Sequence, residues 1–176
     1  MPSQIKIQLP DEQLEEFAAF YEGDRSRLVG LLIRAGASRA DAEDAAQEAM
    51  LAALKDWPTI ASPKAYVRTV ATRTLYRTWE KAERGDIAER RVTQDTMVAA
   101  LDANEDADKA LEMLAALSPA QRMAFALHVD GHDDAEIAQI TGTHPDTVRS
   151  NRRYARQKLI RMLDSESIRK EATHGP

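Results

Sequence analysis

Apolar residues recur every three or four positions along most of the chain, which is the spacing of one face of an α-helix. The first such run predicts a helix that starts at Asp11 and continues to Ala35, with Gly36 as its C-cap. Its apolar positions are Leu14, Phe17, Ala18, Tyr21, Leu28, Leu31, Leu32 and Ala35. The chain therefore opens with an amphipathic helix.

Two further helices are expected in this part of the chain. Ser38 is a candidate N-cap for the first, which runs to Trp57 and is stopped by Pro58. Its apolar stripe consists of Ala42, Ala45, Ala46, Ala49, Met50, Ala53 and Leu54. Ser62-Pro63, an N-cap followed by proline at the first helical position, opens the second, which extends to about Arg84. The stripe expected to be buried in that helix is Val67, Val70, Ala71 and Leu75.

The periodicity is lost over residues 85–108, which carry nine charged side chains. This stretch is interpreted as a tether, with room for a turn of helix, so it marks a domain boundary.

Capping signals divide the rest of the chain into short helices. A helix over 109–117 is followed by Ser118-Pro119-Ala120-Gln121, a capping box that opens a helix to Asp130. A second capping box, Asp133-Asp134-Ala135-Glu136, opens a helix that ends at Gly142. Pro145 then opens a long helix toward Leu163, and residues 164–176 are predicted to be a frayed polar tail.

The composition agrees with an all-helical protein. Of 176 residues, 43% are hydrophobic, enough for a real core, while only 5% are aromatic and there are seven glycines and seven prolines. We therefore predict an all-α fold of two small helical domains joined by a flexible linker, the C-terminal one a helix-turn-helix. The domains are 11–84 and 109–163, the linker is 85–108 and the tail is 164–176.

The chain has no cysteine, which excludes disulfides, a cysteine nucleophile and thiolate zinc sites. It also lacks a signal-peptide pattern and any apolar run long enough to span a membrane. We expect a cytoplasmic protein that has no membrane contact and needs no cofactor.

The net charge of −5 argues by itself against a nucleic-acid partner, but the charge is unevenly distributed. Residues 63–84 carry +4 and residues 145–163 carry +5, so the remainder carries −14. Two basic segments in an acidic chain suggest two separate phosphate contacts.

Residues 133–159 have helix-turn-helix anatomy: a short capped helix, a turn at Gly142, and a basic helix that buries Val148, Ala155 and Leu159. The second helix can enter the major groove of DNA. Its groove-facing stripe is Asp146, Arg149, Ser150, Arg153 and Gln157. The alternative is a solvated basic helix in an ordinary bundle.

Two other segments carry charge in a pattern. Asp41, Asp44 and Glu48 recur on one helical face with Gln47 beside them, which suits a basic partner but equally suits compensation of the helix dipole. The helix over 63–84 interleaves basic and aromatic residues, which suits unstacked single-stranded bases. These are Lys64, Arg68, Arg73, Arg77 and Lys81 with Tyr66, Tyr76 and Trp79. Alternatively, the aromatic residues belong to the core beside a solvated charged face.

In this order and spacing, the three segments resemble a bacterial sigma-70 family factor of the small extracytoplasmic-function (ECF) group. The stretch 39–48 is similar to the signature of the family's second region. The motifs at 117–122, 135–138 and 147–150, with Gly142 and Ala155-Arg156, are similar to its fourth region.

The resemblance implies an RNA polymerase sigma factor, which is not an enzyme, that directs core polymerase to promoters and nucleates promoter melting. The implied polymerase contacts are Asp41, Asp44, Gln47 and Glu48. The loop 57–64 and the following helix would melt and recognise the minus-ten element as single strand, through Lys64, Arg68, Arg73, Tyr76 and Arg77. The minus-thirty-five duplex would be bound by Arg149, Ser150, Arg153 and Arg156. A cognate anti-sigma factor is a further implied partner.

The chain departs from the usual family pattern at His132, Thr143, His144 and Arg152. Two other functions would fit parts of the sequence. A conventional helix-turn-helix regulator that binds duplex DNA without polymerase would leave the acidic block and the aromatic-basic helix unexplained. A metal site would need His128, His132 and His144 with Asp133 and Asp134, but Gly131 separates the first two histidines, and we expect no metal.

Overall fold

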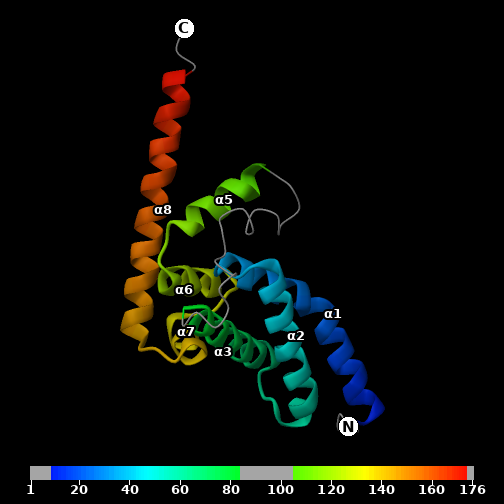
Figure 1. Ribbon diagram of the computed structural model, residues 1–176. Helices are drawn as coiled ribbons and strands as arrows, with labels where there is room; N and C mark the ends of the chain where they lie inside the picture. Colours follow the sequence, from blue (N-terminus) through cyan, green and yellow to red (C-terminus); the bar gives the residue numbers. More distant parts are fainter. Residues whose placement is uncertain (1–8, 84–104, 174–176) are drawn as a thin grey trace.

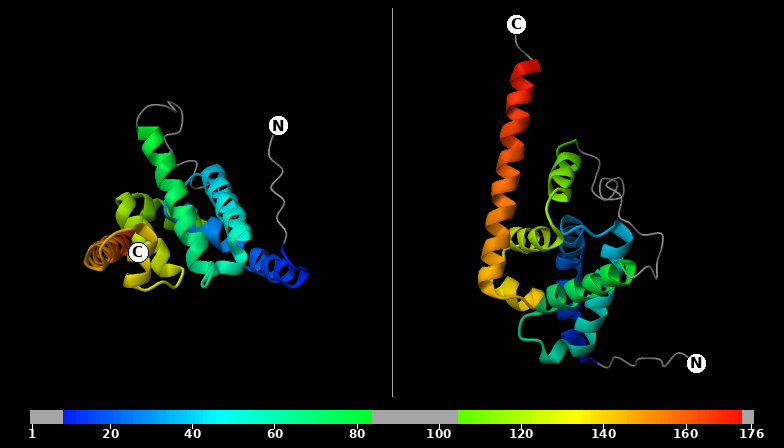
Figure 2. Two further views of the ribbon diagram at one scale, coloured as in Figure 1. Left: turned by 90° about the horizontal axis from the view of Figure 1, so that it is seen from below. Right: turned by 60° about the vertical axis from the view of Figure 1, so that its left-hand side comes forward.

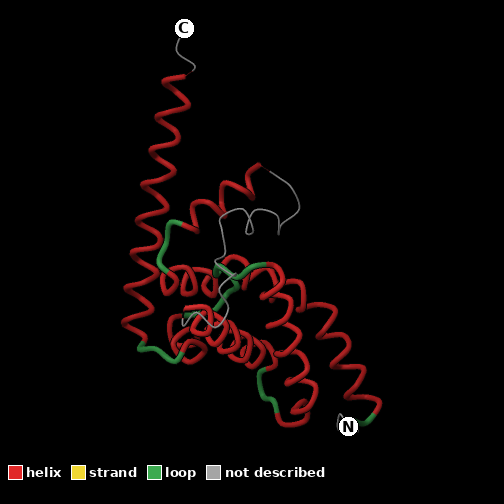
Figure 3. The backbone as a smooth tube through the Cα atoms, in the orientation of Figure 1, coloured by secondary structure: helices red, strands yellow, loops and turns green. Residues whose placement is uncertain are grey.

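The computed structural model describes residues 9–83 and 105–173, and every regular element in these two ranges is a helix (Figures 1 and 3). The all-α prediction is therefore confirmed. The expected linker, residues 85–108, lies outside the described residues up to residue 104.

The first half consists of α1 (Asp11–Arg34), α2 (Arg39–Asp56), a 3₁₀ turn (Trp57–Thr59) and α3 (Pro63–Glu83). The predicted cap of α2 is present, because Ser38 Oγ accepts a hydrogen bond from the Asp41 backbone N–H at 3.1 Å. The turn between α1 and α2 is made by Gly36 at φ +108°, a conformation that favours glycine. The helix boundaries expected from the caps are confirmed here.

The second half consists of α5 (Glu105–Ala115), α6 (Pro119–Val129), α7 (Asp134–Thr141) and α8 (Pro145–Thr173). Both predicted capping boxes form, at the starts of α6 and α7. Gly142 ends α7 in the left-handed conformation at φ +69°, which turns the chain into α8. The helix-turn-helix prediction is confirmed.

Two boundaries differ from the sequence expectation. The frayed tail predicted for residues 164–176 is wrong as far as Thr173, because α8 continues to that residue and its last turns extend beyond the other helices (Figures 1 and 2). No glycine or proline interrupts the sequence between Pro145 and Thr173, so polarity alone did not end the helix. α5 likewise starts at Glu105, four residues earlier than expected, since acidic residues are favourable at a helix N-terminus.

The two halves pack directly against each other. α6 and α7 lie between α8 and the group formed by α1, α2 and α3 (Figure 1). The buried apolar side chains form one cluster that includes Leu28 and Val67 of the first half and Met123 and Ile137 of the second. None of the described helices has an apolar stretch of the length and hydrophobicity needed to cross a lipid bilayer.

Candidate nucleic-acid interface

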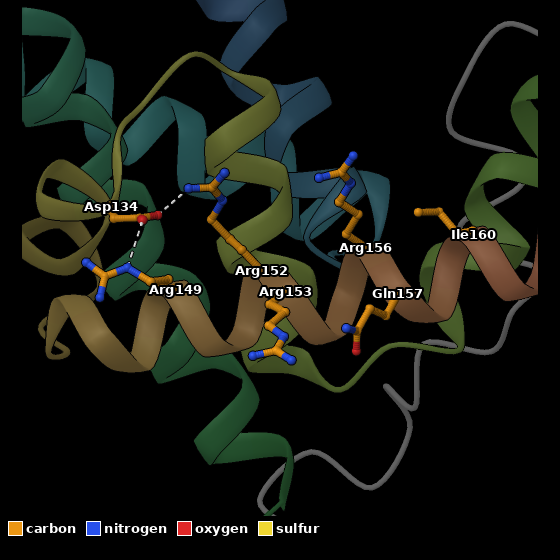
Figure 4. Close-up of a pocket in the computed structure, with 7 residues that line it drawn as sticks. All are labelled: Asp134, Arg149, Arg152, Arg153, Arg156, Gln157 and Ile160. Atoms are coloured by element: carbon orange, nitrogen blue, oxygen red, sulfur yellow. Dashed lines mark hydrogen bonds and ion pairs between the residues drawn. The ribbon is translucent and has the colours of Figure 1, made fainter.

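The exposed arginines of α8 lie beside the face of the helix that is buried. Val148 and Ala155 are buried against α6 and α7, as the spacing predicted. Arg149, Ser150, Arg153 and Arg156 are exposed. Arg149, Arg153 and Arg156, with Gln157 and Ile160, line a hollow of about 430 Å³. Figure 4 shows these side chains along α8. The structure thus brings three of the four predicted duplex-binding residues of α8 around one hollow, and Ser150 is exposed but is not among the lining residues.

Asp134 and Arg152 are part of this hollow but were not predicted as site residues. Arg152 Nη1 forms an ion pair with Asp134 Oδ1, and its Nη2 lies 3.0 Å from His128 Nε2. Arg149 Nε lies 3.9 Å from Asp134 Oδ2 (Figure 4). Arg152 is one of the positions at which the sequence departs from the usual family pattern. Its role here is to connect α8 to α6 and α7.

The basic residues predicted on α3 are divided between two surfaces. Arg73 and Arg77 are exposed, and Tyr76 is partly buried, which raises the pKa of its hydroxyl. Lys64 and Arg68 instead face the second half of the molecule, and Arg68 is 0% exposed. The five predicted side chains therefore do not form one continuous DNA-binding surface in this conformation.

Arg68 lies between two carboxylates from different halves. Its Nε donates to Asp130 Oδ2 at 2.8 Å, its Nη2 donates to Asp24 Oδ1 at 3.0 Å, and its Nη1 pairs with Asp24 Oδ2. Burial would raise the pKa of the Asp130 carboxyl, but Arg68, Lys64 and His132 outweigh it and hold that pKa below its ordinary value. The buried charge is thus compensated across the interface between the halves.

The acidic face of α2 is exposed at Asp44, Gln47 and Glu48. Glu48 Oε1 accepts a hydrogen bond from Arg77 Nη2 of α3 at 3.3 Å. Asp41 differs from the other three because it is only 7% exposed and its Oδ2 accepts a hydrogen bond from Ser38 Oγ at 2.6 Å. The structure therefore groups three of the four predicted residues on one surface and places Asp41 at the start of the helix.

The other aromatic residues near α3 contact protein groups. Trp79 lies against Tyr76, with ring centroids 5.6 Å apart. The Tyr66 hydroxyl donates to Asp56 Oδ2 at 2.7 Å, which raises the pKa of Tyr66. Trp57 makes an edge-to-face contact with Phe17 at 5.2 Å. Several of the aromatic residues thus contribute to packing, as the alternative interpretation of this helix proposed.

The three histidines that a metal site would need lie in different surroundings. His128 is next to Arg152, His132 is buried between Asp130 and Glu136, and His144 is exposed beside Asp146. Among residues 9–83 and 105–173, no three histidine or carboxylate side chains are grouped so that they could hold a metal ion.

Comparison with known families matches both halves of the chain. The model described as "Sigma-70 region 2" matches residues 20–85, and the model described as "Sigma-70, region 4" matches residues 107–159. The first match covers α2 and α3, and the second covers the helix-turn-helix.

Individual proteins agree with these matches. The chain is 33% identical over 152 residues to the ECF RNA polymerase sigma factor SigJ of Mycobacterium tuberculosis (strain ATCC 25618 / H37Rv), which covers 79% of this chain and 48% of SigJ. The chain thus spans about half the length of this relative. The sigma factor RpoE from Bartonella quintana, solved in complex with the anti-sigma factor NepR, is similar in fold with a TM-score of 0.67 at 20% identity. That match covers 85% of this chain and 98% of RpoE.

Proposed function

Because the chain belongs to the sigma-70 family, in its ECF group, we propose that it binds core RNA polymerase, directs it to specific promoters and nucleates promoter melting. The observation that carries this proposal is the presence of region 2 and region 4 in one chain, each with an exposed charged surface of its own. In this role the protein acts in the cytoplasm and performs no covalent chemistry.

The exposed face of α2 is the proposed polymerase contact. Asp44, Gln47 and Glu48 present two carboxylates and an amide on a rigid helix, which suits a basic partner surface. Asp41 supports this surface indirectly, because its contacts with Ser38 fix the first turn of α2.

The exposed part of α3 is the proposed contact for the single-stranded minus-ten element. Arg73 and Arg77 supply cations for phosphates, and Tyr76 supplies an aromatic ring beside them. Arg68 becomes available to the strand only when the second half moves away, because it is buried against Asp130. The Lys64 side chain is partly exposed, and its ammonium donates to the Asp130 carbonyl.

The N-terminal part of α8 is the proposed contact for the minus-thirty-five duplex. Helix-turn-helix proteins place this part of the second helix in the major groove, where arginine binds phosphate or a guanine edge. Arg149, Ser150, Arg153 and Arg156 are the exposed residues suited to this role. An anti-sigma factor is a further proposed partner, supported by the family and by the complex of RpoE with NepR.

Co-elution with core RNA polymerase, followed by promoter-dependent transcription, tests the proposal. We expect Asp44→Arg to abolish both, because it reverses one charge of the proposed docking face. Glu22→Arg reverses an exposed charge on α1 and should leave both unchanged. Glu48→Arg is a less direct variant because it also removes the partner of Arg77.

The contrary result is equally defined. A wild-type chain that does not bind polymerase but binds duplex DNA alone would be a conventional helix-turn-helix regulator. Retained polymerase binding by Asp44→Arg would show that the docking face lies elsewhere.

A further inference from the structure

One residue of the second half engages two cations that the proposed function assigns to promoter DNA. Asp130 follows the last residue of α6, and its carboxylate accepts from Arg68 Nε at 2.8 Å and from Arg68 Nη2 at 3.2 Å. Its backbone carbonyl accepts from Lys64 Nζ at 2.7 Å, and its Oδ2 lies 3.6 Å from the same nitrogen. Both cations are thus directed at a single aspartate.

The contact has the chemistry of a phosphate site. A guanidinium binds the two oxygens of a phosphate in the same bidentate manner as the two oxygens of a carboxylate, and a lysine ammonium adds a point charge. The Asp130 side chain is 7% exposed and that of Arg68 is 0% exposed, so an external phosphate cannot reach this pair in the conformation described.

Arg68 also has a partner that would remain with it after separation of the halves. Asp24 belongs to α1, and its two oxygens pair with Arg68 Nη1 and Nη2. Movement of the second half would remove Asp130 but leave this pair intact, which avoids the large cost of an uncompensated buried charge. The vacated side of the guanidinium would then face solvent together with Lys64.

We propose that Asp130 is an internal substitute for a DNA phosphate, which holds the two halves closed over Lys64 and Arg68 and competes with single-stranded DNA for them. This inference rests on the proposed DNA-binding role of α3. It makes the described conformation a closed state in which the minus-ten surface is incomplete, and it predicts that opening of the halves and DNA binding promote each other.

The other contacts between the halves do not have this property. The Thr72 hydroxyl lies 4.0 Å from Met123 Sδ, and the Arg122 guanidinium lies against Gly36. These contacts add packing to the interface but engage neither Lys64 nor Arg68. Asp130→Asn therefore removes the carboxylate that Arg68 and Lys64 share, and only the backbone carbonyl of residue 130 still accepts from Lys64.

The distance between the halves can be measured by energy transfer between two dyes. The chain contains no cysteine, so Glu22→Cys on α1 and Ser165→Cys on α8 supply two exposed and unique attachment sites. In this background we expect Asp130→Asn to lower the transfer efficiency and to bind a 20-nucleotide single-stranded DNA at least about tenfold more tightly. The affinity gain reflects the larger fraction of open molecules.

Three controls isolate the contact. Asp130→Glu keeps the carboxylate and should remain closed, and Glu112→Gln removes the same charge from an exposed position on α5 without effect. The gain in DNA affinity should persist when Arg149→Ala and Arg153→Ala are added, because these residues belong to α8. Circular dichroism checks that each variant keeps its helical content.

A measurement on the wild-type chain does not depend on any variant at position 130. Saturating single-stranded DNA should lower the transfer efficiency between the same two dyes, because DNA displaces Asp130. The proposal would be overturned if saturating single-stranded DNA left the transfer efficiency of the wild-type chain unchanged. It would also be overturned if Asp130→Asn opened the halves without an increase in DNA affinity. Neither readout involves polymerase, so failure of the sigma-factor proposal in the co-elution experiment would be recognised separately.

Discussion

Adjacent arginines of α8 have different surroundings, although the sequence alone presents them as one basic cluster. Arg153 is exposed and is directed away from the packed side of the helix in Figure 4. The Arg152 side chain is 27% exposed and pairs with Asp134 while it lies beside His128. We therefore assign Arg153 to DNA binding and Arg152 to the attachment of α8 to the preceding helices.

Alanine at each position should separate these roles. Arg153→Ala should change the free energy of unfolding by less than about 0.5 kcal/mol and weaken binding to minus-thirty-five duplex DNA by about 1 kcal/mol or more. Arg152→Ala should lower the free energy of unfolding by about 1 kcal/mol, because Asp134 loses its main hydrogen-bond donor. Urea unfolding and a salt titration of duplex binding measure both effects. The assignment would be contradicted if Arg153→Ala lowered the stability and Arg152→Ala weakened only DNA binding.

Short local signals predicted the helix starts, and they did so because each capping group acts on backbone groups two or three residues away. Ser38, Ser118 and Asp133 each cap the helix predicted from the sequence. The extent of α8 was harder to predict, since a polar sequence without a breaker is compatible with both a tail and a solvated helix. The α8 arginines share a surface for the same local reason, because their spacing follows the helical period.

The turn between α7 and α8 depends on the backbone of one glycine. A Cβ added at Gly142 would meet no atom within 4 Å, so the penalty of Gly142→Ala comes from its φ of +69° and not from a collision. We expect Gly142→Ala to lower the free energy of unfolding by about 1 kcal/mol. Gly23→Ala is the matched control, because this glycine lies inside α1 with open space around it, and alanine there should add about 0.5–1 kcal/mol. Equal stabilities of the two variants in urea would contradict this account.

The burial of Arg68 is a property of the whole molecule that the local sequence pattern could not reveal. From its position in the helix and its neighbours, Arg68 is predicted to lie on an exposed DNA-binding face. Its partner Asp130 lies 62 residues away, beyond the residues that the structure leaves undescribed between α3 and α5. No periodicity or capping rule connects two such positions, so the division of the basic residues of α3 between two surfaces required the three-dimensional arrangement.

The closed arrangement should open in acid but not near neutrality. The charged or titratable groups that face the Asp130 carboxylate are Arg68 and Lys64 of α3, Arg34 of α1 and His132, and Asp24 shares Arg68 with it. Since the pKa of Asp130 is lower in the folded chain than the ordinary value of about 3.9, its contribution is fully present above that value. It is lost as the pH falls through the lowered pKa.

Energy transfer between dyes at positions 22 and 165 should therefore stay constant from about pH 8 to pH 5 and fall only below about pH 4. The Asp130→Asn variant lacks the titrating group, so it should start from a lower transfer efficiency and show a smaller acid step. Opening of the wild-type chain between pH 5 and pH 7 would mean that a group other than this carboxylate controls the interface, because an aspartate whose pKa is lowered by Arg68 remains charged throughout that range.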